Sequence, residues 1–365
     1  MDDLTYKIGI GLIPGVGDIL AKKLISWCGG VEAVFSEKKT ALLKIPNVGE
    51  TLAASITNSD VMAKAKKEVE FIAKHGINYS FYLDDDYPYR LKNCQDAPVI
   101  FYYKGKVDFD NQKTISVVGT RMATQYGKEF CNKLLDDLQS RSHNPLIVSG
   151  LAYGIDICAH KAALRNGLPT VAVLGHGLAQ LYPAVHKPVA REIIDNGALM
   201  TEFLSDSTIE KNNFVRRNRL IAGLTDLTIV VESNTKGGAL ITAEIANSYN
   251  RDVFACPGRV TDNYSSGCNK LIKTNKAHLL QSVEDIEYIM GWDNEPKTTP
   301  TRELFPVVSP EEEAVLRLLR ESNECTVDEL SFKLKMLVSK VSILLLNLEL
   351  AGLVITLPGK VYKAV

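Results

Sequence analysis

The chain has 365 residues, of which 45% are hydrophobic and 23% charged, and its formal net charge is −1, a composition typical of a globular protein with two or three domains. Its first residues lack the basic and apolar segments of a secretory signal, and no apolar run reaches the roughly 18 residues of a membrane span. We therefore expect a cytoplasmic protein without a membrane-spanning segment.

Residues 1–75 have a helical pattern and contain two similar turns, 13–18 and 45–50. Each turn ends in a glycine followed by a carboxylate and a helical stretch, as in a helix-hairpin-helix unit, whose backbone N–H groups can hold a phosphate. Proline and glycine can also simply punctuate a small helical bundle. Because Asp18 and Glu50 would repel phosphate, we expect a helix-hairpin-helix (SAM-like) domain with a structural or partner-binding role.

Residues 76–292 alternate short apolar runs, rich in β-branched residues, with helical stretches. Continuous apolar strands separated by helices indicate an α/β fold, in which a doubly wound, Rossmann-like parallel sheet is covered on both faces. Ligands of such sheets bind beyond the carboxyl ends of the strands. The predicted strands are 114–118, 146–148, 170–174, 227–231 and 252–255.

Residues 293–308 contain three prolines among Thr, Asn and charged residues, which is typical of a linker. After this linker, an acidic helix start is followed by a second helix whose Thr326 and Glu329 have the form of a capping box.

A third helix and two strands around a turn complete a predicted winged helix over residues 309–365. The third helix, 338–351, is mostly apolar, and Lys340 is its only basic residue. A helix that reads a DNA groove normally exposes Arg, Lys, Asn or Gln. We therefore predict that the winged helix contacts protein.

Positive charge is concentrated in residues 211–219, which contain three arginines, one lysine, three asparagines and Phe214 but no carboxylate. Guanidinium groups match phosphate oxygens, and an aromatic ring among them can stack on an unpaired base. This pattern favours a single-strand nucleic-acid site. The alternatives are a solvated basic helix start and, for Phe214, a place in the core.

Glycines follow four of the predicted strands, at Gly119, Gly150, Gly175 and Gly237. Backbone N–H groups of such loops, at helix N-termini, form a surface that suits phosphate. A dinucleotide cofactor is not expected, because the Gly-x-Gly-x-x-Gly fingerprint is missing: Gly177 is not followed by the third glycine.

Several sequence blocks follow one another between about residues 80 and 280. They include Asp86-Tyr87-Pro88, Val118-Gly119-Thr120-Arg121, Ser149-Gly150, Phe214 with Arg217-Asn218-Arg219, Glu232 with Gly237-Gly238, and Gly267 with Asn269. In this order the blocks resemble the DNA-processing protein A (DprA/Smf) family. One departure is Val215, which stands where the family usually has proline.

The resemblance implies an extended Rossmann fold that binds single-stranded DNA without cleaving it. It also implies a homodimer formed through the Rossmann-like domain, which protects incoming DNA and loads the RecA recombinase in natural transformation or recombination. We hypothesise that the cationic side chains contact phosphates and that Phe214 stacks on a base. The implied DNA-binding residues are Gly119, Arg121, Ser149, Gly150, Lys211, Phe214, Arg217, Asn218, Arg219, Lys236, Gly237, Gly238 and Asn269.

No metal, cofactor or catalytic residue is expected. The seven cysteines include no Cys-x-x-Cys pair and are interpreted as buried, reduced thiols. His-Glu-x-x-His and Gly-x-Ser-x-Gly motifs are missing, and Asp156 and His160 are expected to share one helix face and not to hold a metal.

Two other functions remain open. Residues 237–244 resemble the Gly-Gly-x-Gly-Thr-x-x-Glu loop of nucleotide phosphoribohydrolases. In this chain Ala239 replaces the middle glycine and the threonine is displaced, so we interpret Glu244 as a helix-surface or salt-bridging residue. In the second alternative, the basic segment would bind an acidic protein surface as part of a scaffold.

Overall fold

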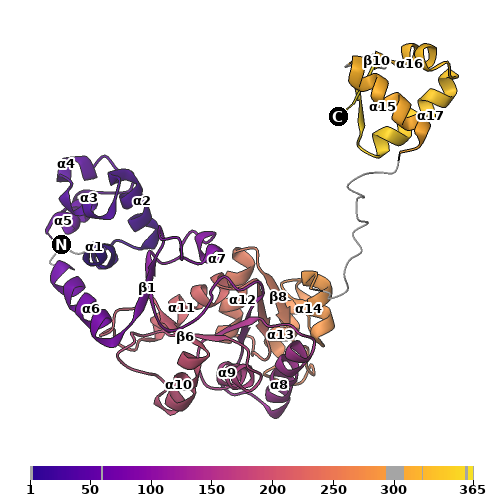
Figure 1. The fold of residues 1–365 in the computed structure, drawn as a ribbon. Helices are drawn as coiled ribbons and strands as arrows, with labels where there is room; N and C mark the ends of the chain where they lie inside the picture. Colours follow the sequence, from indigo (N-terminus) through magenta and orange to yellow (C-terminus); the bar gives the residue numbers. More distant parts are fainter. Residues whose placement is uncertain (1–2, 59–60, 293–307, 323, 358–360, 365) are drawn as a thin grey trace. The chain divides into compact units, whose positions relative to one another are not determined.

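The computed structural model describes residues 3–58, 61–292, 308–322, 324–357 and 361–364. The chain divides into two units, Met1–Trp292 and Asp293–Val365 (Figure 1). The predicted linker lies outside the described residues, except for Val308. Among the helices that the structure describes, none has the length and hydropathy needed to cross a bilayer.

The first unit begins with a helical segment, and the two predicted turns connect helices of this segment. Val16 donates its N–H to the Ile13 carbonyl and Val48 to the Ile45 carbonyl, each at 3.0 Å. The residue before each valine has a positive φ, 84° at Gly15 and 73° at Asn47, so the two turns repeat one structure. The helices are α1 (Asp3–Ile10), α2 (Asp18–Cys28), α3 (Val31–Ser36), α4 (Lys39–Leu42), α5 (Glu50–Asn58) and α6 (Val61–His75).

A nine-stranded sheet follows, in the order β1-β2-β6-β5-β4-β3-β7-β8-β9. Strand β2 is antiparallel to both of its neighbours, and all other pairs are parallel. The strands are β1 (Asn78–Phe81), β2 (Ile100–Gly105), β3 (Thr114–Val118), β4 (Leu146–Ser149), β5 (Thr170–Val173), β6 (Gly197–Thr201), β7 (Leu227–Val230), β8 (Asp252–Ala255) and β9 (His278–Leu279).

The five predicted strands are β3, β4, β5, β7 and β8, and the predicted α/β Rossmann-like class is confirmed. The sequence did not identify β1, β2, β6 and β9, which lie towards the two edges of the sheet and extend it. Their patterns are weaker: β1 is half polar, β6 begins with a glycine and β9 has two residues.

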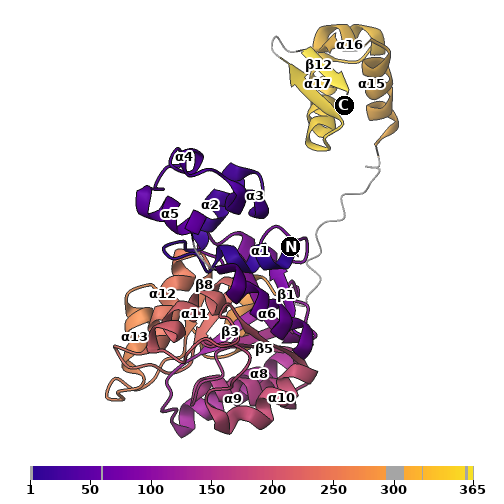
Figure 2. The same ribbon diagram turned by 90° about the vertical axis from the view of Figure 1, so that its left-hand side faces the viewer.

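Helices cover both faces of the sheet (Figure 2). Along β4, Leu146 and Val148 pack in one core with α11 and α12, whereas Ile147 packs in another core with α8 and α9. This alternation is expected for a strand buried on both faces. The helices are α7 (Tyr89–Lys92), α8 (Gln125–Ser140), α9 (Ile155–Arg165), α10 (Lys187–Asp195), α11 (Lys211–Gly223), α12 (Gly238–Ser248), α13 (Ser266–Lys273) and α14 (Val283–Met290).

Two carboxylates bond the N-terminal helices to segments next to the sheet, just before β2 and after β6. Asp18, at the start of α2, accepts a hydrogen bond from the Val99 N–H at 3.0 Å. Glu68, on α6, accepts bonds from the Ser205 N–H at 3.0 Å and the Ser205 hydroxyl at 2.6 Å. Burial raises the pKa of Glu68, whereas the hydrogen bonds from Ser205 oppose that rise. Asp18 therefore links α2 to the chain just before β2, while the structural or partner-binding role of the whole helical domain stays a prediction.

The second unit is a winged helix, as predicted. The capping box is present: the Glu329 N–H donates to the Thr326 hydroxyl at 3.3 Å, and the Thr326 N–H donates to Glu329 at 2.8 Å. The elements are α15 (Pro310–Ser322), β10 (Cys325–Thr326), α16 (Val327–Leu334), α17 (Val338–Leu350), β11 (Val354–Leu357) and β12 (Val361–Ala364). Of the predicted turn, 357–360, only Leu357 is described, and it is the last residue of β11.

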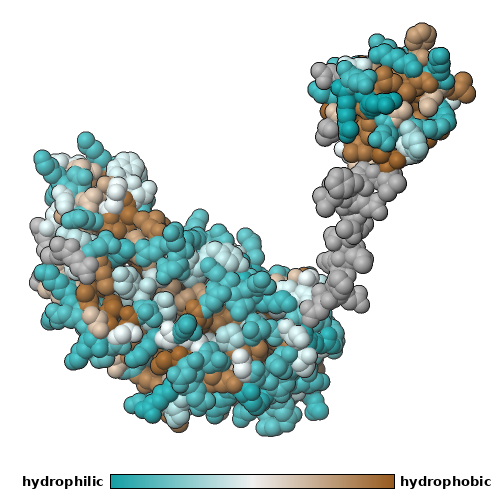
Figure 3. Space-filling view, viewed as in Figure 1, coloured by the Kyte–Doolittle hydropathy of each residue, from teal (hydrophilic) through white to brown (hydrophobic). Residues whose placement is uncertain are grey.

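Apolar side chains reach the surface of this second unit, as Figure 3 shows. On α17 they include Ile343, Leu346 and Leu350, all exposed and spaced at helical intervals. The interpretation of the winged helix as a protein-contact module stays a prediction, and this exposed apolar stripe is the surface on which to test it.

All seven cysteines are free thiols. Five are buried, and Cys28 and Cys158 are half-buried. The predicted burial is therefore confirmed for those five.

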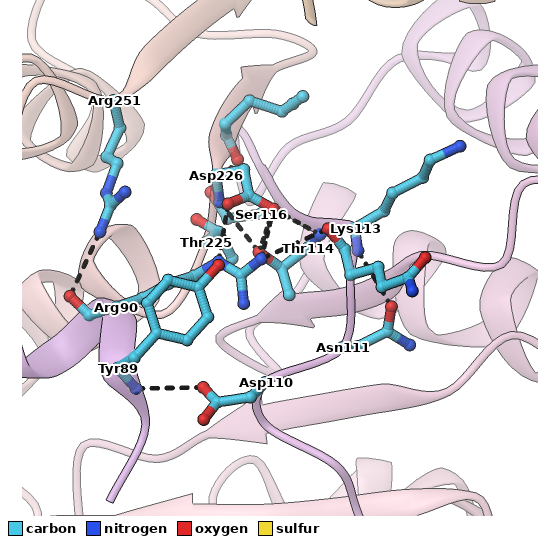
Figure 4. A network of polar contacts seen from close by, with 12 residues as sticks. Tyr89, Arg90, Asp110, Asn111, Lys113, Thr114, Ser116, Thr225, Asp226 and Arg251 are labelled. Carbon is cyan, nitrogen blue, oxygen red and sulfur yellow. Dashed lines mark hydrogen bonds and ion pairs between the residues drawn. The ribbon is translucent and has the colours of Figure 1, made fainter. Parts of the chain in front are cut away.

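A buried ion pair joins α7 to the amino ends of β3 and β7 (Figure 4). Arg90 is 1% exposed, and its Nε and Nη2 donate to the two Asp226 carboxylate oxygens at 2.7 and 2.8 Å. The Thr114 N–H and hydroxyl both donate to Asp226 Oδ2 at 2.9 Å. The Asp226 carboxylate therefore holds together helix α7 and the starts of β3 and β7.

We expect Arg90→Met to lower the free energy of unfolding by about 3 kcal/mol, because it leaves the half-buried Asp226 carboxylate without its buried cation. Urea unfolding measures the loss. Arg165→Ala is the control: Arg165 is half-exposed and pairs with Asp136 at 2.5 Å, so its loss should cost at most about 1 kcal/mol. Equal costs for the two variants would contradict this account.

Candidate nucleic-acid interface

The glycine loops meet at the carboxyl ends of β3, β4, β5 and β7. Chain order reverses between β3 and β7, so this is the switch point at which Rossmann-like sheets bind ligands. The Thr120 N–H donates to the Glu232 carbonyl at 2.7 Å, which joins the loops after these two strands. The Glu232 carboxylate is buried and accepts a bond from the Thr124 N–H at 2.9 Å.

Phe214 lies half-buried on α11, over the loop after β5. A Cβ at Gly175 would lie 2.7 Å from the Phe214 ring, so the ring needs glycine there. The Tyr182 ring centroid is 5.9 Å from that of Phe214, and the Arg121 guanidinium carbon is also 5.9 Å from the Phe214 centroid. We call Phe214, Tyr182, Arg121 and Gly175 the Phe214 cradle. An accessible ring beside a guanidinium can stack on a planar base.

Arg217 lies beneath the same loops and is only 4% exposed. Its Nη1 donates to the Gly150 carbonyl at 2.9 Å and also to the Val173 carbonyl. A Cβ at Gly150 would lie 2.5 Å from Nη2, so position 150 must lack a side chain. Burial lowers the pKa of Arg217 to about 10, although Asp156 opposes this shift. The side chain therefore joins the ends of β4 and β5 and is not open to a ligand.

Asp156 and His160 share the buried face of α9. Burial raises the pKa of Asp156, and the nearby Arg217 opposes that rise. The His160 Nδ1 lies 2.8 Å from the Thr170 hydroxyl, which itself donates to the Ile147 carbonyl at 2.9 Å. Since that hydroxyl proton is already used, Nδ1 donates, and the Nε2 acceptor has no partner among the described residues.

Metal ligation by this pair is not supported, because no cluster of His, Cys, Asp or Glu among the described residues could hold a metal ion. Burial, followed by the positive charge of Arg217, lowers the pKa of His160 to about 3. His160 is therefore a neutral core residue.

Arg219 and Arg216 face carboxylates. The largely buried Arg219 guanidinium contacts Asp18 at 3.0 Å and Glu202 at 2.5 Å. The exposed Arg216 contacts Glu202 at 2.7 Å and Asp18 at 3.4 Å. Desolvation lowers the pKa of Arg219, but Glu202 and Asp18 outweigh it and the net shift is upward. These two cations hold α2 against α11, and a phosphate contact by Arg219 stays a prediction.

Three other predicted residues use their polar groups internally. The Ser149 hydroxyl is buried and donates to the Val117 carbonyl at 2.6 Å. The Asn269 amide donates to the Gly258 carbonyl at 2.9 Å and accepts from the Gly258 N–H at 3.2 Å. Asn218 accepts from the Arg217 Nε at 3.3 Å. Their predicted DNA contacts are untested. Ser149 links β4 to β3, Asn269 holds the loop at Gly258, and Asn218 bonds to Arg217 on the same helix.

Three predicted cations are open to solvent: Arg121, Lys211 and Lys236. None of the three forms an ion pair with a described residue. Lys211 begins α11, and Lys236 precedes the start of α12, where the Gly238 N–H has no hydrogen-bond partner in the described part of the chain. We call Arg121, Lys211 and Lys236 the phosphate rim, because cations beside open helix N-termini bind phosphate.

Gly119 and Gly237 shape the loops that carry Arg121 and Lys236. A Cβ at Gly119 would lie 2.5 Å from the Ile155 side chain, and one at Gly237 would lie 2.1 Å from the Ser233 hydroxyl. Both loops therefore pack too closely for a larger residue.

Glu244 lies on the exposed face of α12, 3.5 Å from Lys276. This confirms its interpretation as a surface, salt-bridging residue. At this position the chain thus lacks the carboxylate, directed into the Phe214 cradle, that the hydrolase resemblance would require.

Sequence reasoning missed two features of the interface. The first is Tyr182, although an aromatic residue shortly after the glycine loop at Gly175 is a usable signal. The second feature is a groove of about 690 Å³ beside Arg121, lined by residues of α8, α9 and neighbouring loops. Its lysines are far apart in the sequence, so no local pattern indicated it.

We expect the free energy of unfolding to fall as the pH falls from about 6.5 towards about 3, because the unfolded chain protonates His160 and the folded chain does not. The contribution is at most about 1.4 kcal/mol per pH unit. His160→Asn keeps a donor for Thr170 but cannot titrate, so urea unfolding of this variant should show a shallower pH dependence. His75→Asn, on the exposed surface, is the control that keeps His160. Parallel pH profiles for wild type and His160→Asn would refute the assignment.

Comparison with known proteins gives a consistent result. Residues 78–290 match the family model of DNA recombination-mediator protein A, and residues 295–360 match that of the DprA winged helix domain. A DNA processing protein DprA of Streptococcus pneumoniae is 41% identical over 204 residues, covering 56% of this chain and 71% of that protein. A putative DNA processing protein DprA of Mycobacterium tuberculosis is 32% identical over 321 residues, covering 84% and 82%.

Two solved structures are also similar. The X-ray structure of DprA from Streptococcus pneumoniae has a TM-score of 0.68 at 33% identity and covers 79% of this chain and 98% of its own. A DprA structure from Helicobacter pylori, described for its single-stranded DNA binding mode, has a TM-score of 0.53 at 29% identity and covers 59% and 97%.

Proposed function

Because this chain belongs to the DNA recombination-mediator protein A (DprA/Smf) family, we propose that it binds single-stranded DNA at the Phe214 cradle. One observation carries the proposal: a half-buried aromatic ring lies beside the exposed Arg121, at the switch point of the sheet. The family relationship and the Helicobacter pylori structure support the same ligand.

The chemistry favours a single strand over a duplex. A base can stack on Phe214 only if one of its faces is free, and in a duplex the neighbouring base pairs cover both faces. The phosphate rim would neutralise the backbone on either side of the stacked base, and the open N–H of Gly238 would bind the same oxygens. Such contacts carry no sequence information, so binding should tolerate any sequence.

The thirteen predicted DNA-binding residues then divide into two groups. Arg121, Lys211, Phe214, Lys236 and Gly238 would contact the strand. The others would act as positioning residues, because they are buried, fill packing positions or bond to the loops: Gly119, Ser149, Gly150, Arg217, Asn218, Arg219, Gly237 and Asn269.

We also infer from the family that the protein is a cytoplasmic homodimer that protects incoming single strands, without cleaving them, and loads RecA on them. The description of the family as a recombination mediator supports this role. The direct test is the lag before RecA assembles on a protein-coated single strand. If the protein leaves this lag unchanged while binding the strand, the RecA step is wrong and the DNA-binding proposal stands.

We expect Phe214→Ala to weaken binding of a fluorescent oligothymidylate by about 1–3 kcal/mol, because the stacked base loses its platform. Fluorescence anisotropy measures the affinity. Tyr288→Ala removes an aromatic residue that is 80% exposed on α14 and should bind like wild type. If Phe214→Ala also binds like wild type, the ring does not hold a base.

Binding should depend on salt. Three phosphates neutralised by the phosphate rim predict a log–log slope of about −2 for a short oligothymidylate, and Arg121→Ala should reduce its magnitude by about 0.7. Lys39→Ala, which removes an exposed cation paired with Glu50, is the matched control. No preference for DNA over an acidic protein at any salt concentration would instead support the scaffold alternative.

A further inference from the structure

The groove beside Arg121 has no role in the function proposed so far. It holds about 690 Å³ and lies against the first turns of α8 and α9. Arg121 belongs both to this groove and to the Phe214 cradle, so the two sites are continuous. The lining residues that matter here are Arg121, Lys128, Tyr153, Cys158, Lys161 and Tyr264.

The groove is cationic. None of its lining residues is a carboxylate, and the exposed Lys128 and Lys161 form no ion pair with any residue that the structure describes. By contrast, the nearby Arg165 is neutralised by Asp136. A chain of net charge −1 therefore keeps uncompensated positive charge next to the phosphate rim.

The half-buried Cys158 thiol senses this charge. A hydrogen bond from Cys131, and then the charges of Lys128, Arg165 and Lys161, lower the pKa of Cys158 despite its burial. The thiol therefore lies within the field of the cations, and it provides a chemical probe on the groove wall.

Two tyrosines lie among the cations. Tyr153 is 47% exposed, and its ring packs edge-on against His186, with centroids 5.1 Å apart at 65°. Tyr264 is held through its carbonyl, which accepts the Ser233 N–H at 2.6 Å. Aromatic rings interleaved with cations are the pattern that binds successive bases and phosphates of a single strand.

We propose that this groove is a second segment of the nucleic-acid site, which takes the unpaired bases and phosphates next to the base on Phe214. The inference rests on the proposed function and deepens it. Lys128 and Lys161 would neutralise two more phosphates, and the tyrosines would offer further stacking surfaces. An acidic protein segment is the competing occupant, but it would leave the tyrosines and the continuity through Arg121 without a purpose.

Oligonucleotide length tests the proposal. A short oligothymidylate of about six nucleotides should fill the cradle, and one of about twenty should also enter the groove. The log–log salt slope should change from about −2 for the short strand to about −3.5 for the long one. The double variant Lys128→Ala/Lys161→Ala should return the long strand to about −2 and leave the short strand unchanged.

The matched control is Lys133→Ala/Lys187→Ala, which removes two exposed lysines outside the groove lining. It should keep the wild-type slope for both strands. If the groove variant and this control behave alike on the long strand, the groove does not hold phosphates and the proposal is overturned, while short-strand binding still supports the cradle.

Alkylation of Cys158 by N-ethylmaleimide gives a local readout, with the half-buried Cys28 as the internal reference. The long strand should slow modification of Cys158 but not of Cys28, and the short strand should protect neither thiol. Protection should be lost in Lys128→Ala/Lys161→Ala. Protection by oligoglutamate equal to that by the long strand would overturn the proposal in favour of a protein contact. If neither strand binds at all, the proposed function itself fails.

Discussion

The buried guanidinium of Arg217 is the interaction on which the interface depends. Carbonyl groups at the carboxyl ends of β4 and β5 need donors, and Arg217 supplies them to Gly150 and Val173. The contact requires glycine at position 150 and fixes the rotation of α11 about its own axis. Phe214 lies one turn earlier on that helix and Lys211 one turn before it, so a residue that no ligand reaches places both groups at the loops.

The cations named here fall into a buried group and an exposed group, because burying a charge without a partner costs free energy. A buried guanidinium needs carbonyl or carboxylate partners, and Arg217 and Arg219 have them. Cations that remain exposed and unpaired come from several loops and helices: Arg121 follows β3, Lys236 follows β7, and Lys128 and Lys161 lie on α8 and α9. The positive surface is therefore assembled by the topology of the sheet, although residues 211–219 contain the densest run of basic residues.

The helical segment contributes to the interface indirectly. Its two hairpins have the same turn geometry, yet Asp18 at the mouth of the first one pairs with Arg219 and bonds to Val99. The carboxylate that we expect to repel phosphate at this hairpin anchors α2 to α11 and to the chain just before β2. Glu68 anchors α6 in a similar way, by accepting hydrogen bonds from Ser205, which follows β6. These helices are bonded to the domain that bears the cradle and support its geometry.

Local chemistry in the sequence determined much of this protein. Apolar periodicity identified β3, β4, β5, β7 and β8, glycine loops marked the strand ends, and the capping box at Thr326 identified a helix start of the winged helix. Only the tertiary structure decided which charges are available, because burial and pairing join residues far apart in the chain: Asp18 and Arg219 are separated by 201 positions. For the same reason, the sequence did not predict the groove between α8 and α9 or the internal hydrogen bonds of Ser149 and Asn269. No local sequence pattern indicates which residues a side chain contacts after folding.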